Sequence, residues 1–246
     1  MSGESFVQRY IESHEYELND YAPETAGDRL AVIIETRDIP SLPWVLRNIA
    51  HHTGWQILGY CSDENIHRFE QAGFAIDLRR IALSSTDAYS RLLCSDAFWE
   101  DLPEHALIFQ SDTFMIRSGI EPYLKYDYVG APWKWAYEES GKQIFQGGGN
   151  GGFSLRQASK MREIIRAIPR ERLYDYVKFQ PRPKGLLSED LYFTLAMKVL
   201  GCYLPDFETQ KRFCVETIFY EKPLAVHAVT KHLDVHQVRA LFETVE

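Results

Sequence analysis

The chain has 246 residues, of which 45% are hydrophobic, 13% aromatic and 25% charged, and its formal net charge at pH 7 is −8. A chain of this length and composition can bury a sizeable core, which excludes an intrinsically disordered protein. The acidic balance, with no basic block, also argues against a protein that wraps nucleic acid.

The residue pattern sets two further classes aside. The four cysteines form no Cys-x-x-Cys pair, which argues against a zinc ribbon and indicates reduced side chains. The sequence holds no apolar signal segment near its start and no apolar run of the roughly 20 residues that cross a bilayer. We therefore expect a cytoplasmic protein, and contact with the inner face of a membrane through a lipid-linked substrate stays open.

The first chemical signal follows a predicted N-terminal helical arm over residues 1–28. Five apolar residues, 30–34, predict a strand buried on both faces. The strand runs directly into polar and charged residues: Glu35, Thr36 and Arg37.

Strands and helices then alternate. The expected order is a helix that begins after Ser41, a strand at residues 55–61, a helix at 63–73, a strand at 74–78 and a helix at 87–99. This order predicts right-handed crossovers and a mainly parallel, doubly wound sheet.

The stretch ALIFQSDTF, residues 106–114, predicts a central strand with polar residues at its end. In an α/β sheet, ligands bind at the carboxyl ends of such strands. If the backbone stays extended, Gln110 and Asp112 project to the same side, with Ser111 between them. The alternative is a strand that simply ends in a polar turn.

Residues 115–153 are rich in glycine and aromatic residues and predict loops and short strands that form a second, aromatic-lined half. Trp133, Trp135, Tyr128 and Tyr137 could provide a floor for a sugar ring, although aromatic side chains more often lie in the core. Five glycines in residues 147–152 permit a close approach of backbone to a ligand, and the candidate contacts are Gly148, Gly149, Asn150, Gly151 and Gly152. The run matches neither a P-loop nor a dinucleotide fingerprint, and its plain alternative is a flexible hairpin loop.

A second pair of acids begins a helix that should be buried. Ser188, Glu189 and Asp190 precede LYFTLAMKVLG, which is apolar nearly all round. A carboxylate at the N-terminus of a buried helix is suited to act as a general base. The other interpretation is that these residues simply cap the helix. Farther on, His227 follows an apolar run and is either a core histidine or a metal ligand.

Six strings stand in order along the chain: VIIETRDIP (32–40), LIFQSDTF (107–114), YDYVGAPW (126–133), GGNGGFSLR (148–156), SEDLYF (188–193) and PLAVH (223–227). Together they resemble the GT-A type of nucleotide-sugar glycosyltransferase, and more narrowly the family known as domain of unknown function 5672, over about residues 30–232. The resemblance implies an α/β fold, a Rossmann-like doubly wound mixed sheet flanked by helices. The implied single domain spans residues 29–246, with a nucleotide-binding half (29–114), an acceptor half (115–232) and a closing helix (233–246).

The resemblance also implies roles for particular residues. Asp112 matches the metal end of an Asp-x-Asp motif, and Gln110 stands where the first Asp is usual, so Mn²⁺ or Mg²⁺ would rely on Asp112, His227, diphosphate oxygens and water. The string at 188–190 looks like the x-Glu-Asp motif whose Asp is the base in inverting members. The expected donor contacts are Glu35, Thr36, Arg37, Gln110, Ser111 and Asp112.

The expected function is inverting transfer of a sugar from a nucleotide sugar, UDP-linked and with galactose as a candidate, to a hydroxyl of a glycan or lipid-linked glycan in polysaccharide biosynthesis. Asp190, with Glu189 beside it, would act on the acceptor hydroxyl. Two alternatives stay open. One is a module that binds a nucleotide sugar without turnover, which the missing first Asp favours, and the other is a nucleotidyltransferase.

Overall fold

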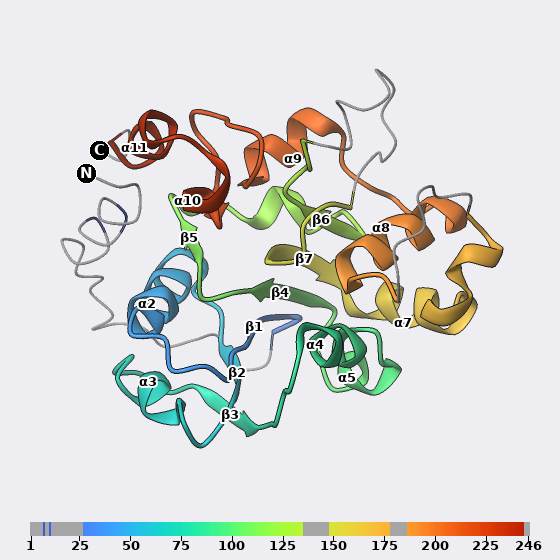
Figure 1. Ribbon diagram of the computed structural model, residues 1–246, viewed down its shortest axis with the longest axis horizontal. Helices are drawn as coiled ribbons and strands as arrows, with labels where there is room; N and C mark the ends of the chain where they lie inside the picture. Colours follow the sequence, from blue (N-terminus) through green and yellow to red (C-terminus); the bar gives the residue numbers. More distant parts are fainter. Residues whose placement is uncertain (1–6, 8–9, 11–26, 135–147, 178–185, 244–246) are drawn as a thin grey trace.

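A computed structural model describes residues 7, 10, 27–134, 148–177 and 186–243 (Figure 1). Most of the predicted arm, together with Trp135, Tyr137 and Gly147, lies outside these residues.

The fold is built on a six-stranded mixed sheet of order β3-β2-β1-β4-β7-β6. The strands are β1 (Arg29–Ile34), β2 (Ile57–Cys61), β3 (Asp77–Arg80), β4 (His105–Phe109), β6 (Tyr128–Gly130) and β7 (Phe153–Gln157). β1 pairs in parallel with β2 and β4, and β2 with β3, whereas β7 runs antiparallel to β4 and β6. The predicted α/β doubly wound mixed sheet is confirmed, and β4 lies near its centre.

Helices cover both faces of this sheet because alternate strand residues point to opposite sides. On one side, Val32 and Ile34 of β1 share a core cluster with residues of α4 (Thr86–Leu93), α5 (Asp96–Glu100), α7 (Ala158–Ala167) and α8 (Glu189–Leu200). On the other side, Ala31 and Ile33 pack with residues of α2 (Leu42–Thr53), α3 (Ile66–Glu70) and α9 (Phe207–Phe213).

A smaller sheet extends from the end of β4. Its order is β5-β9-β8, formed by β5 (Thr113–Met115), β9 (Ala225–His227) and β8 (Cys214–Val215). The helices α10 (Val229–His232) and α11 (Val235–Glu243) lie beside β5 (Figure 1) and close a third apolar cluster, against which Val7 and Tyr10 pack. This sheet brings the C-terminal part of the chain to the carboxyl end of β4.

Several element boundaries differ from the prediction. The expected helix at residues 87–99 is two helices, because the chain turns after Leu93 and Ser95 caps α5 by accepting a hydrogen bond from the Phe98 N–H (3.4 Å). The strand expected at residues 74–78 forms at Asp77–Arg80 instead. Residues 202–230, expected as strand and loop, also contain α9 and α10.

Two short helices and the long helix α8 complete the fold. Short 3-10 helices occupy Glu121–Tyr123 and Arg170–Asp175. The helix α8 is buried over most of its length, but Val199 and Leu200 are exposed near its end. In the described part of the chain, no helix combines the length and apolarity needed to cross a membrane.

Candidate active site

The polar residues after β4 form a tight turn. The Thr113 N–H donates to the Gln110 carbonyl (3.1 Å), so the backbone leaves the extended conformation that would put Gln110 and Asp112 on one side of a strand. Both side chains nevertheless reach the same atom, because His227 Nε2 lies 3.2 Å from Gln110 Oε1 and 3.2 Å from Asp112 Oδ1. The pairing of β5 with β9, which sets Thr113 opposite His227, produces this convergence.

Positive charge surrounds Asp112. Lys231 of α10 places Nζ 2.6 Å from Asp112 Oδ2, while His227 contacts the other oxygen. Burial acts against ionisation, but these two neighbours outweigh it and lower the pKa of Asp112 well below its ordinary value. Ala228 links His227 to α10 with left-handed backbone (φ 49°), and its N–H donates to the Asp112 carbonyl (3.0 Å). The turn therefore fixes Lys231 beside Asp112.

A third carboxylate lies behind His227. Glu216 is buried, its Oε1 accepts a hydrogen bond from Asn150 Nδ2 (2.8 Å), and the same oxygen is 3.4 Å from His227 Nδ1. Burial disfavours the charged imidazole, yet Asp112 and Glu216 together raise the pKa of His227 to about 9. Sequence reasoning missed Glu216, whose only signal was an acid that follows two apolar residues.

The glycine run packs closely against this cluster. A Cβ atom added to Gly152 would lie 2.1 Å from His227 Nε2, so only glycine fits beside the ring. The Gly152 carbonyl accepts hydrogen bonds from the Gln110 N–H (2.9 Å) and from Thr113 Oγ1 (3.0 Å). Gly149 donates its N–H to Thr194 Oγ1 of α8 (3.1 Å). Residues 148–152 are thus braced by several elements, which disagrees with a flexible hairpin loop.

The two acids of α8 have different surroundings. Asp190 is partly exposed, and its Oδ2 accepts a hydrogen bond from the Gly151 N–H (3.3 Å). Glu189 is buried and paired through both oxygens with Arg156 (2.6 and 3.0 Å). Ser188 makes no side-chain cap bond, so the capping interpretation for this serine does not hold. Of the two acids, Asp190 is the one with access to solvent.

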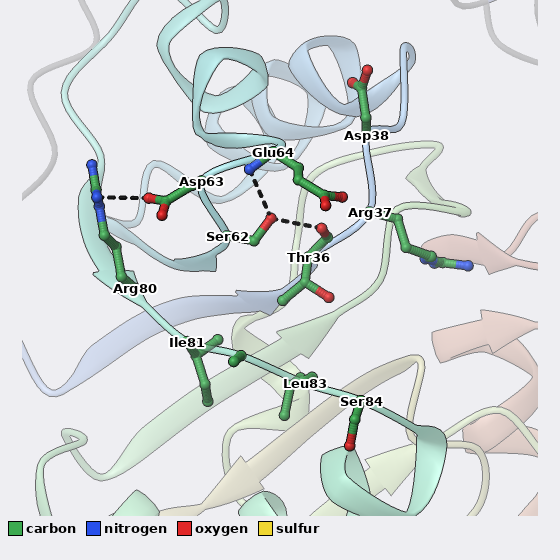
Figure 2. Close-up of a pocket in the computed structure, with 11 residues that line it drawn as sticks. Thr36, Arg37, Asp38, Ser62, Asp63, Glu64, Arg80, Ile81, Leu83 and Ser84 are labelled. Atoms are coloured by element: carbon green, nitrogen blue, oxygen red, sulfur yellow. Dashed lines mark hydrogen bonds and ion pairs between the residues drawn. The ribbon is translucent and has the colours of Figure 1, made fainter.

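A cavity of about 980 Å³ opens at the carboxyl ends of β1, β2 and β3 (Figure 2). It is lined by Thr36, Arg37, Asp38, Ser62, Asp63, Glu64, Arg80, Ile81, Ala82, Leu83 and Ser84. In Figure 2 the segment from Arg80 to Ser84 runs along one side, and Thr36 and Arg37 lie across from it. The sequence predicts no site at residues 62–64, which follow β2, or at residues 80–84, which begin at the end of β3, because neither strand end carries a clear sequence signal.

Glu35 connects this cavity to the Asp112 cluster. Its carboxylate accepts hydrogen bonds from Arg37 Nε (2.8 Å) and Ser111 Oγ (2.7 Å), and Ser111 precedes Asp112 in the chain. Burial raises the pKa of Glu35, but Arg37 and Ser111 outweigh that effect and lower the pKa overall. The Glu35 anion therefore links the end of β1 to the end of β4, next to the cavity.

Trp133 is placed in the core. It keeps 9% of its surface exposed and belongs to the core cluster on the α8 side of the sheet, as does Tyr128.

The donor atoms around His227 Nε2 meet part of the needs of a divalent cation. Within the described ranges, no group of three or more His, Cys, Asp or Glu side chains could hold a metal ion. One carboxylate oxygen, one imidazole nitrogen and the amide oxygen of Gln110 do converge there, and Mn²⁺ accepts all three donor types. This set fits a cation that displaces the proton from His227 Nε2 and takes its remaining ligands from a bound ligand and water.

Comparisons with known proteins agree with this architecture. The apo-form glycosyltransferase GlyE of Streptococcus pneumoniae TIGR4 superposes with a TM-score of 0.53 at 13% sequence identity, over 89% of this chain and 60% of that chain. At this identity the likeness shows the fold. No curated protein matches the sequence significantly.

The sequence also matches a protein-family model. The match covers residues 75–227, more than half of the chain, and includes β4, the glycine run, the start of α8 and His227. The chain belongs to the family described as protein of unknown function (DUF5672).

Proposed function

We propose that the protein is a glycosyltransferase that moves a sugar from a nucleotide sugar to a hydroxyl of a carbohydrate. The observation that carries this proposal is the meeting of Asp112, His227 and Asp190 around Gly151 and Gly152. The fold that the chain shares with GlyE, which is named a glycosyltransferase, supports the same reaction class.

The donor nucleotide would occupy the cavity at the ends of β1 to β3. Its diphosphate would then point toward Asp112, where Arg37 and Lys231 offer positive charge on either side of the β4 turn. Arg37 suits this role because its guanidinium can donate to two phosphate oxygens at once. We keep UDP as the donor nucleotide and galactose as the first sugar to test.

Asp112 and His227 would hold a divalent cation, with the Gln110 amide oxygen beside them. When bound, Mn²⁺ or Mg²⁺ would supply positive charge opposite the departing diphosphate. Glu216 holds the far side of the His227 ring, so that Nε2 faces Gln110 and Asp112.

Asp190 would act as the general base. Its carboxylate takes the proton of the acceptor hydroxyl while that oxygen bonds to the anomeric carbon, and the bond from this carbon to the diphosphate oxygen breaks. The leaving diphosphate carries the electron pair, and the sugar configuration inverts because the acceptor oxygen attacks the anomeric carbon from the side opposite the diphosphate. The acceptor would be a glycan or a lipid-linked glycan, and a lipid-linked one would bring the protein to a membrane surface.

The test is the variant Asp190→Asn, which keeps the size of the side chain and removes its basicity. Turnover of a UDP-sugar with a glycan acceptor should be abolished, while UDP affinity stays within about threefold because Asp190 does not touch the nucleotide cavity. Retained turnover would remove Asp190 from the role of base.

A second candidate function is a module that binds a nucleotide sugar without turnover. Gln110 in place of an acid and Lys231 on Asp112 favour it, because both make the site less negative for a metal. Calorimetry with UDP, with and without Mn²⁺, followed by a donor-hydrolysis assay distinguishes the two. Binding without hydrolysis or transfer would identify the module.

A further inference from the structure

Arg156 of β7 is a buried cation in the centre of the molecule. Its guanidinium donates to both oxygens of Glu189, at 2.6 and 3.0 Å, and the Arg156 side chain has no exposed surface. Burial disfavours the charge, but Glu189 outweighs this and raises the pKa of Arg156 above its ordinary value. The two side chains therefore form an ion pair between the sheet and the first turn of α8.

Aromatic rings enclose this ion pair. The guanidinium carbon lies 4.7 Å from the ring centroid of Tyr128, 5.5 Å from that of Phe193 and 5.7 Å from that of Trp99. A buried pair of charges is costly to desolvate, and apolar residues of similar size often give equal or greater stability. Stability alone is therefore a poor reason for charges at this position.

The ion pair touches the segment that holds Asp190. A Cβ atom on Gly151 would lie 2.1 Å from Glu189 Oε1 and 2.9 Å from Arg156 Nη2, so the Gly151 backbone rests on both partners. Arg156 Nε also donates to Ser154 Oγ (2.9 Å), which in turn donates to the Gly151 carbonyl (3.2 Å). The N–H of the same glycine donates to Asp190 Oδ2 (3.3 Å).

We propose that Arg156 and Glu189 are a positioning pair, which sets the Asp190 carboxylate against Gly151 without touching either substrate. Glu189 fixes the first turn of α8, Arg156 fixes the glycine segment, and Asp190 lies where these two supports meet. This inference rests on the proposed function, in which Asp190 is the base. It assigns Glu189 a role other than proton transfer.

The test replaces both charges at once, with Arg156→Met and Glu189→Met in the same chain. This double variant leaves no unpaired buried charge, and the flexible methionine side chains can fill the space between the aromatic rings, so it should fold with a Tm close to that of the wild type. We expect kcat to fall by at least about tenfold with the donor KM within about twofold, because a misplacement of about 1 Å can cost a hundredfold in rate. In a crystal structure of the double variant, the Asp190 carboxylate should no longer accept the hydrogen bond from the Gly151 N–H.

Tyr192→Phe is the matched control. It removes a buried hydrogen bond from the same helix, that of the Tyr192 hydroxyl to the Ile168 carbonyl (2.7 Å), and should leave kcat within about twofold even if Tm falls.

If the double variant does not fold, Arg156→Lys replaces it, since lysine keeps the charge but loses the two-point contact. A lowered kcat with an unchanged Tm then supports the positioning role, and an unchanged kcat overturns it.

The outcomes separate this inference from the proposed function. Wild-type kcat in the double variant, with the hydrogen bond between Gly151 and Asp190 intact in its crystal structure, would overturn the positioning role. If instead Asp190→Asn keeps full turnover, the proposed base has failed. The crystal structure of the double variant still decides whether the pair sets the position of Asp190.

Discussion

The Asp112 carboxylate and the His227 imidazole meet at 3.2 Å, although one follows the central strand and the other lies near the C-terminus. Their contact depends on the register of β5 and β9, which pairs Thr113 with His227. The small sheet therefore assembles the site, and the large sheet supplies only one side of it.

Asp112→Asn should have opposite consequences with and without Mn²⁺. With Mn²⁺, UDP affinity should fall by at least about tenfold, because the only carboxylate among the three converging donors is lost. Without Mn²⁺, the variant should bind UDP at least as well as the wild type, since a negative charge facing the diphosphate has gone. Isothermal titration calorimetry measures both affinities.

Asp101→Asn provides the control for charge removal, because Asp101 forms an exposed ion pair with Arg79 and neither residue lines the cavity. Its UDP affinity should equal that of the wild type in both conditions. Equal losses for Asp112→Asn with and without Mn²⁺ would contradict a metal at this site and favour direct contact of the nucleotide with Asp112.

Gly152→Ala should disturb the site through a clash. The added Cβ would lie 2.1 Å from His227 Nε2, and the ring is held on its other sides by Asp112 and Glu216. UDP affinity in Mn²⁺ should fall by more than about tenfold, because the imidazole must leave its position.

Gly201→Ala separates this effect from backbone strain. Gly201 has left-handed backbone (φ 66°) and no atom within 4 Å of an added Cβ, so the variant should lose about 1–2 kcal/mol of stability and no affinity. Thermal unfolding and calorimetry of both variants test the pair. Gly152→Ala with wild-type affinity would mean that His227 does not contribute to the nucleotide site.

The parts of the site that were predicted from sequence are those with a strong local pattern. Apolar runs that break into polar residues marked the ends of β1 and β4, and the apolar helix after Ser188 marked the buried start of α8. Such runs report burial directly, because a segment without polar positions cannot face water on either side.

The parts that were missed depend on pairings between distant segments. Glu216 and Lys231 reach the site through strands of two and three residues, which are too short to show any periodicity. Arg156 is buried beside Glu189 of α8, 33 residues farther along the chain, and beside aromatic rings that other elements supply. Charged residues that are buried in pairs cannot be recognised from one partner alone.

Glu35 should make the free energy of unfolding depend on pH in the acidic range. Its pKa lies below the ordinary value of 4.5 in the folded state, because the hydrogen bonds from Arg37 and Ser111 outweigh burial. A lowered folded-state pKa contributes stability that is fully present above about pH 4.5 and is lost as the pH falls through the folded value. Glu35→Gln should therefore be less stable than the wild type near neutral pH.

Urea unfolding of both proteins at several pH values measures this dependence. The difference in the free energy of unfolding should be constant above about pH 6 and should shrink toward about pH 3. A difference that stays constant over the whole range would show that the carboxylate contributes through packing and not through its charge.

Glu189→Ala should be among the most destabilising single changes in the described part of the chain. It leaves the Arg156 guanidinium buried without its anion, and breaking one side of a buried ion pair costs about 3–5 kcal/mol. Glu163→Ala is the matched control, because Glu163 forms an equally short ion pair with Lys160 (2.6 Å) on the surface, with 57% of the Glu163 side chain exposed. Exposed pairs of this kind contribute about 0–1 kcal/mol. Urea unfolding at neutral pH compares the two variants, and a loss of similar size in both would mean that Arg156 finds solvent or another anion when Glu189 is removed.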